Sequence, residues 1–132
     1  MKKVTPFLMF QHNNAEEAMN FYLSIFEDSE IVHMKRYGAN ETGKEGTINE
    51  ATLSIKGQEF MFFDSPVKHQ FDFTPSISIF ITCDSENEID DLFAKLSTDG
   101  GVLMPLGDYG FSKKFGWVND KFGVSWQINL PN

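Results

Sequence analysis

The feature that most constrains the fold of this chain is a pattern of residues that occurs twice. A shift of 71 positions places Asn14 on Ser85, Glu17 on Glu88 and Ile25 on Leu96. In both copies a capping residue precedes an apolar-periodic segment and has a glutamate three residues further on, which is typical of a helix start. The repeat therefore predicts a tandem duplication of one structural unit.

The two helices are predicted over residues 15–26 and 86–98, with Asn14 and Ser85 as their caps. Each carries one apolar stripe at helical spacing. The stripe of the first helix consists of Ala15, Ala18, Met19, Tyr22, Ile25 and Phe26, and that of the second of Ile89, Leu92, Phe93 and Leu96. One face of each helix is therefore expected to lie in a core.

Each half also contains four segments with strand character, so the predicted order is strand, helix, strand, strand, strand. The strands are expected at 4–10, 30–37, 48–55 and 59–63 in the first half, and at 76–83, 102–104, 115–119 and 124–130 in the second. Gly57 and Gly123 suit the positive φ of the hairpin turns. We expect a single α+β domain over 1–132, with modules of about 1–65 and 76–132 joined by a linker of about 64–75.

Alternation along the strands separates purely apolar faces from mixed ones. Val124, Trp126 and Ile128 share one face of the last strand, whereas Ser125 and Gln127 share the other. Helices should cover the apolar faces, and the mixed faces then either meet solvent, form an interface or line a cavity. Several mixed-face residues are large and apolar and would be costly to expose, which favours a partly apolar cavity: Phe7, Met9, Met61, Phe63 and Phe80.

Composition excludes several classes of protein. The 132 residues carry a formal net charge of −8, which repels nucleic acid. No segment approaches the roughly 18 apolar residues that a membrane span requires. Cys83 is the single cysteine, so an internal disulfide is excluded and a reducing, cytoplasmic location is expected. It lies on an apolar strand face and is interpreted as a buried small hydrophobe.

Three segments carry a resemblance to a known family. They read Thr5-Pro6-Phe7-Leu8-Met9-Phe10, Leu103-Met104-Pro105-Leu106-Gly107-Asp108-Tyr109 and Phe122-Gly123-Val124-Ser125-Trp126-Gln127. Together with Ala15-Glu16-Glu17-Ala18, Phe21-Tyr22 and Phe115-Gly116-Trp117-Val118, they span nearly the whole chain. The chain resembles the PhnB-like family of the vicinal oxygen chelate superfamily, which also holds glyoxalase I, bleomycin-resistance proteins and extradiol dioxygenases.

The resemblance implies paired βαβββ modules with curved mixed sheets around a cup, commonly in a homodimer. In metal-using members four side chains of the modules bind an ion, and their projected positions here are Phe7, Met61, Ser78 and Gln127. A phenyl ring cannot ligate a metal, and thioether, hydroxyl and amide groups are poor replacements for the usual His and Glu. We therefore expect neither a metal nor a cofactor.

Other candidate residues have two interpretations each. The loop 105–113, with Tyr109, is either a lid over the cup or a stiff surface loop. Glu50 is a general base if it is buried in the cup and a solvated carboxylate if that face is open, which is the favoured interpretation. His12, His33 and His69 lack ligand spacing and are interpreted as surface or edge residues. The glycines of the chain form no G-x-G-x-x-G turn, so the sequence does not support S-adenosylmethionine chemistry.

Three functions are compatible with the sequence. The first is a protein that binds a small, partly apolar molecule in a metal-free cup; whether it is an enzyme is left open. The second is a metal-dependent lyase, isomerase or thiol transferase, and the third is a non-catalytic dimeric interaction module. The residues expected to line the cup in the first case are Phe7, Glu50, Met61, Phe63, Ser78, Phe80, Tyr109 and Gln127. The sequence names neither the ligand nor the arrangement of a dimer.

Overall fold

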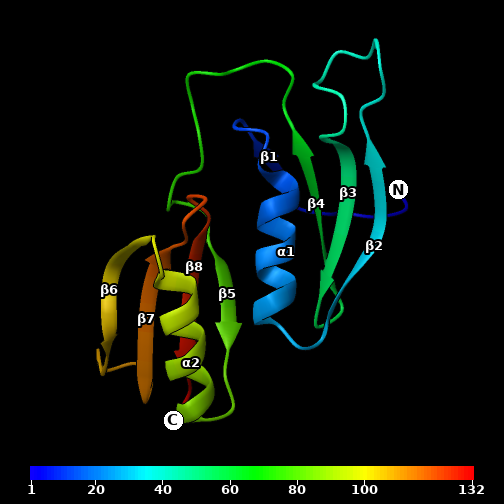
Figure 1. The fold of residues 1–132 in the computed structure, drawn as a ribbon. Helices are drawn as coiled ribbons and strands as arrows, with labels where there is room; N and C mark the ends of the chain where they lie inside the picture. The colour runs from blue at the N-terminus through cyan, green and yellow to red at the C-terminus, as the bar shows by residue number, and fades with distance from the viewer. The chain divides into compact units, whose positions relative to one another are not determined.

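The computed structural model describes residues 1–132, and the chain divides into two compact units, Met1–Asp72 and Phe73–Asn132 (Figure 1). The first contains β1 (Phe7–Phe10), α1 (Ala15–Ile25), β2 (Ser29–Arg36), β3 (Ile48–Ile55) and β4 (Gln58–Asp64). The second contains β5 (Ile79–Thr82), α2 (Glu86–Ser97), β6 (Gly101–Gly107), β7 (Lys114–Asn119) and β8 (Ser125–Leu130). No helix is both long and apolar enough to cross a membrane.

The two units have the same sheet topology. The strand order is β1-β4-β3-β2 in the first sheet and β5-β8-β7-β6 in the second. Each sheet has one parallel pair at one of its edges, β1 with β4 in the first sheet and β5 with β8 in the second. The other pairs are antiparallel. The two sheets thus have the same strand order and the same position of the parallel pair, so the chain uses one connection pattern twice. This confirms the predicted tandem βαβββ duplication.

The predicted elements are all present, and the differences lie at their ends. β6 continues to Gly107 and so takes in Pro105 and Leu106, for which the sequence predicts a loop. A proline fits there because β6 is an edge strand, where a missing N–H costs no ladder hydrogen bond. β1 and β5 are shorter than predicted, because residues 4–6 and 76–78 precede the paired segments.

Each helix covers the purely apolar face of its own sheet, as the alternation predicts. α1 buries its stripe except for the half-buried Phe26, which lies beyond the helix end. The Tyr22 ring packs on β4, where its centroid is 6.0 Å from that of Phe62. α2 buries Ile89, Leu92 and Leu96. Beneath α2, Val118, Trp126 and Ile128 are at most 1% exposed. At roughly 25 cal/mol per Å² of apolar surface, these contacts dominate the stability of each unit.

The two helices begin differently, which corrects one prediction. Ser85 caps α2 as expected, because its side chain accepts a hydrogen bond from the Glu88 N–H at 3.1 Å. Asn14, by contrast, makes no capping hydrogen bond, and its side-chain oxygen is buried without a partner. The buried Asp64 replaces it, since its Oδ1 accepts from the Ala15 N–H at 3.0 Å. A residue at the end of β4 therefore caps α1 across 49 positions of sequence.

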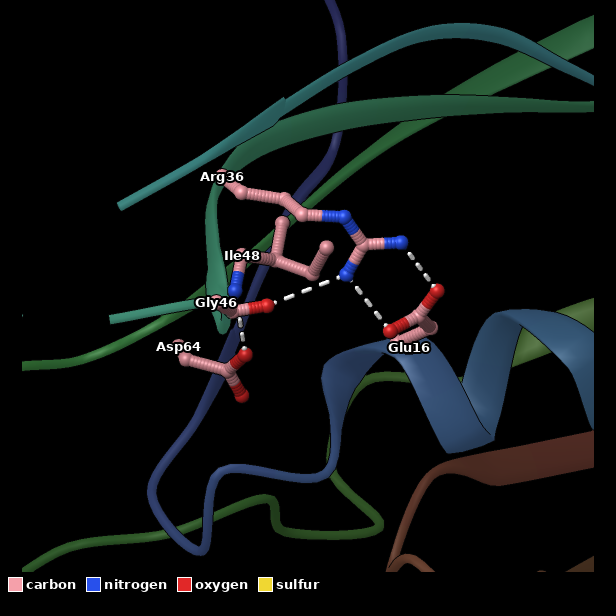
Figure 2. A network of polar contacts seen from close by, with 5 residues as sticks. All are labelled: Glu16, Arg36, Gly46, Ile48 and Asp64. Carbon is pink, nitrogen blue, oxygen red and sulfur yellow. Dashed lines mark hydrogen bonds and ion pairs between the residues drawn. The ribbon is translucent and has the colours of Figure 1, made fainter. Parts of the chain in front are cut away.

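Asp64 also connects α1 to the sheet, and Figure 2 shows the part of this link that runs from its carboxylate to Ile48. Its Oδ2 accepts from the Ile48 N–H at 2.8 Å at the start of β3. Nearby, the Arg36 guanidinium donates to both carboxylate oxygens of Glu16, at 2.7 and 2.5 Å, and to the Gly46 carbonyl at 3.0 Å. The hydrogen bond from Arg36 lowers the pKa of Glu16. This pair therefore adds its small stabilisation at neutral pH, and loses it as the pH falls through the lowered pKa.

The β3–β4 hairpin carries backbone strain that one substitution should relieve. Its two turn residues, Lys56 and Gly57, have φ values of 52° and 83°. A turn with two positive φ angles prefers Asn-Gly, because asparagine tolerates this region better than lysine does. We expect Lys56→Asn to raise the free energy of unfolding by about 0.5–1 kcal/mol in urea denaturation. An unchanged or lower stability would contradict this assignment of strain.

Candidate functional site

The face of the second sheet that α2 does not cover consists of neutral side chains. Cross-strand pairing puts Phe80, Gln127 and Trp117 in one row. Thr82, Asn129 and Phe115 form a second row, and Ser125 pairs with Asn119 in a third. Residues directly opposite one another on neighbouring strands share a face. The uncovered face of β5, β8 and β7 therefore carries no charged side chain.

A hydrogen-bonded cluster lies on this face at the start of β8. The Ser78 and Ser125 hydroxyl oxygens are 2.7 Å apart. The Trp117 Nε1–H donates to Ser125 Oγ at 2.8 Å, and Gln127 Nε2 donates to Ser78 Oγ at 3.2 Å. Ser125 is 3% exposed, whereas Ser78 and Gln127 are half-buried. The cluster thus has a buried base and an accessible outer edge.

Aromatic side chains lie on the same face toward the other end of β7. Phe115 is buried, and the ring of Phe111 contacts it edge-on at a centroid distance of 5.0 Å. The ring centroids of Tyr109 and Phe115 are 6.1 Å apart, and the Tyr109 hydroxyl donates to the Pro105 carbonyl at 2.6 Å. Tyr109 and Phe111 are exposed, as is Phe80 on β5. The 108–113 loop therefore extends the neutral face with exposed aromatic surface.

The uncovered face of the first sheet is apolar at its β1–β4 edge and charged further along. Phe7 pairs with Met61 and is 53% exposed, and its ring lies 4.7 Å from that of Phe63. Glu50 lies on the same face of β3, half-buried, opposite Lys35 of β2. The structure thus places Phe7, Met61, Phe63 and Glu50 on one face of the first sheet.

The residues at the projected metal positions do not fit a divalent cation. Phe7 and Met61 offer an aromatic ring and a thioether, and Ser78 and Gln127 are engaged in the hydrogen-bonded cluster. No group of three or more His, Cys, Asp or Glu side chains is arranged so that it could hold a metal ion. Because divalent metals in such sites need imidazole, thiolate or carboxylate ligands, this donor set does not support metal-assisted chemistry.

Strand register shows how the four residues at the projected metal positions are arranged within their sheets. Phe7 lies directly opposite Met61, but the residue opposite Gln127 is Phe80, and Ser78 contacts Gln127 from two positions earlier. The alternation of the last strand predicts Ser125 on the mixed face but not its place at the centre of the cluster. Trp117 is named only in the family segment Phe115-Gly116-Trp117-Val118, not as a site residue. No local pattern indicates that Trp117 belongs to the cluster, because only the pairing of β7 with β8 brings it next to Ser125.

The remaining nucleophilic and titratable candidates lie elsewhere. His12, His33 and His69 are exposed, as predicted. Cys83 is buried, also as predicted, and burial raises the pKa of its thiol to about 12, with the nearby Glu88 and Asp84 carboxylates adding to the effect. A thiol with such a pKa is not a nucleophile near neutral pH.

The raised pKa of Cys83 predicts very slow modification of the native protein. At pH 8 the thiolate fraction should be about 1,000-fold below that of an ordinary cysteine. We expect the reaction with 5,5′-dithiobis(2-nitrobenzoate), followed by absorbance, to be slower by about that factor than after unfolding in guanidinium chloride. Equal rates in the native and unfolded states would show that the thiol is accessible and ionised.

Comparison with known proteins now identifies the family. A family model described as 3-demethylubiquinone-9 3-methyltransferase matches residues 2–129. The chain belongs to this PhnB-like family. The solved structure of a PhnB protein from Bacillus cereus, which carries the same methyltransferase description, is 60% identical with a TM-score of 0.93, covering 98% of this chain and 99% of that one. No curated protein matches the sequence.

More distant structures establish the fold. A glyoxylase/bleomycin resistance protein/dioxygenase domain from Frankia is 12% identical, with a TM-score of 0.70 over 100% of this chain and 93% of that one. The fosfomycin resistance protein FosX of Listeria monocytogenes, solved with Mn(II), is 10% identical, with a TM-score of 0.65 over 98% of this chain and 92% of that one. This PhnB-like protein therefore has the α+β glyoxalase/bleomycin resistance/dihydroxybiphenyl dioxygenase fold.

Proposed function

We propose that this PhnB-like protein binds a small, partly apolar molecule on the uncovered face of its second sheet, without a metal ion. The observation that carries the proposal is the neutral face of the second sheet, where the Ser78–Ser125–Gln127–Trp117 cluster borders the exposed ring of Phe80. A few convergent polar groups next to apolar surface are typical of small-molecule sites. The first unit has a separate apolar surface of its own, formed by the exposed Phe7 with Met61 and Phe63.

The family description names a methyltransferase, but the residues present do not support that chemistry here. S-adenosylmethionine-dependent methyltransferases of the Rossmann type use a glycine-rich turn between a parallel strand and a helix. Each sheet of this chain is mixed, with one parallel pair. A metal-dependent reaction of the FosX kind would need ligands that the projected positions lack. Binding is therefore proposed here without an assigned reaction.

Metal content and ligand-induced stabilisation test this proposal. Protein purified without chelator is analysed by plasma mass spectrometry after incubation with Mn, Ni, Zn, Fe(II) or Mg, and we expect no stoichiometric metal. A thermal-shift screen of small aromatic compounds should then find ligands that raise Tm by several degrees at saturation. Phe80→Ala should abolish the shift, whereas Val67→Ala, which removes an equally exposed apolar side chain from a loop, should not. Stoichiometric metal lost in Gln127→Ala would overturn the metal-free site.

A second candidate function is homodimerisation, which is favoured by the exposed apolar side chains. Ile77, Phe80 and Phe111 are 76%, 56% and 60% exposed, and closed two-fold dimers are the commonest way to bury such surface. We expect sedimentation equilibrium to give twice the 15.1 kDa chain mass. A monomer at all concentrations would remove this candidate and leave ligand binding unaffected.

A further inference from the structure

The hydrogen-bonded cluster on the second sheet has one hydroxyl hydrogen more than it uses. Ser125 Oγ accepts from Trp117, Ser78 Oγ accepts from Gln127, and the two hydroxyls share a single hydrogen across 2.7 Å. Each serine brings one hydrogen, so the other hydroxyl hydrogen has no acceptor inside the cluster. Its location decides what this site can recognise.

Burial assigns the spare hydrogen to Ser78. If Ser78 donated to Ser125, the leftover hydrogen would belong to a side chain that is only 3% exposed, and an unsatisfied buried donor is costly. If Ser125 donates instead, the leftover hydrogen belongs to the half-buried Ser78, at the accessible edge of the cluster. The Gln127 amide has a second N–H beside it, because only one of its two hydrogens is used. Two donors thus lie next to each other.

We propose that Ser78 and Gln127 form a donor pair that binds the neutral carbonyl oxygen of a ligand whose apolar body lies on Phe80. This inference rests on the proposed function and names its ligand class: ketones, aldehydes and amides with an apolar or aromatic group. A carboxylate is a poorer match, since the uncovered face of β5, β8 and β7 has no cationic side chain to compensate its charge. Phe80 lies directly opposite Gln127, so apolar surface adjoins the donors.

The two tryptophans provide an internal reporter and control for the test. Trp117 donates its indole N–H into the cluster, whereas the indole N–H of Trp126 donates to Asp120 on the face covered by α2. Acetophenone is titrated into ¹⁵N-labelled protein, and the two indole signals, assigned with Trp117→Phe, are followed by NMR. We expect the Trp117 signal to shift with concentration and the Trp126 signal to stay in place.

Matched probes and variants then isolate the carbonyl contact. α-Methylstyrene replaces the carbonyl oxygen of acetophenone with a methylene group of similar shape, and benzoate replaces its methyl group with a charged oxygen. We expect both to bind about tenfold more weakly than acetophenone, and Ser78→Ala to weaken acetophenone binding by about fivefold to tenfold, as for the loss of one hydrogen bond. Ser76→Ala, an exposed serine outside the cluster, should leave the affinity unchanged.

The possible results separate the inference from the function on which it rests. Equal affinities for acetophenone and α-methylstyrene, or an unchanged affinity in Ser78→Ala, would overturn the donor pair while leaving apolar ligand binding intact. Tighter binding of benzoate would overturn the neutral ligand class. The absence of any shift with all three probes would overturn both proposals. Thermal unfolding of each variant confirms that it is folded before its affinity is compared.

Discussion

Asp64→Ala is expected to lower the free energy of unfolding by at least about 3 kcal/mol. The Asp64 carboxylate is 2% exposed and accepts from two backbone N–H groups, those of Ala15 and Ile48. Hydrogen bonds to a charged group contribute about 1.5–3 kcal/mol each, and both donors would be left buried and unsatisfied. Urea denaturation followed by circular dichroism measures the change.

Two further variants separate this role from a general effect of removing charge. Asp64→Asn keeps one acceptor oxygen but turns an amide N–H toward a backbone donor, so it should recover less than half of the loss. Asp28→Ala removes an exposed carboxylate of the same unit and should change stability by less than about 0.5 kcal/mol. A loss in Asp64→Ala no larger than that in Asp28→Ala would show that the start of α1 does not depend on this carboxylate.

Asp120→Ala is expected to have a similarly large effect on the second unit. Asp120 is 3% exposed, and its Oδ1 accepts from the N–H groups of Phe122 and Val124 at 2.9 and 3.1 Å. Its Oδ2 accepts from the Trp126 indole N–H at 2.9 Å, which connects the β7–β8 turn to the core under α2. Three donors lose their acceptor, and we expect a loss of about 3–5 kcal/mol in the same urea assay.

A double-mutant cycle with Trp126→Phe tests the contact between Asp120 and the indole. Trp126→Phe removes the indole N–H but retains an aromatic ring in the core. If the hydrogen bond couples the two residues, Asp120→Ala and Trp126→Phe should be non-additive by about 1 kcal/mol or more. Strict additivity would show that Asp120 acts on the turn alone. Asp91→Ala serves as the control for removing an exposed carboxylate from the second unit. Asp99→Ala is unsuitable, because the φ of Asp99 is 58° and its substitution would also change the backbone strain.

Much of the fold could be predicted from local patterns. The Asn14/Glu17 and Ser85/Glu88 spacings located both helices, and strand alternation separated the helix-covered faces from the uncovered ones. These predictions hold because hydrophobic periodicity and turn chemistry act between residues that are close in sequence. The resemblance, carried by segments such as Phe122–Gln127, identified the family that the comparisons establish.

Contacts between distant residues were decided only by the tertiary structure. The sequence predicted Asn14 as the cap of α1, but Asp64 provides it from 49 residues away, because β4 ends beside the helix start. The Trp117–Ser125–Ser78 cluster arises likewise from the pairing of β7, β8 and β5, whose registers no local pattern specifies. The sequence by itself thus determined the elements and their faces. Strand register and burial decided which polar groups meet, because a hydrogen bond depends on positions within a few tenths of an ångström.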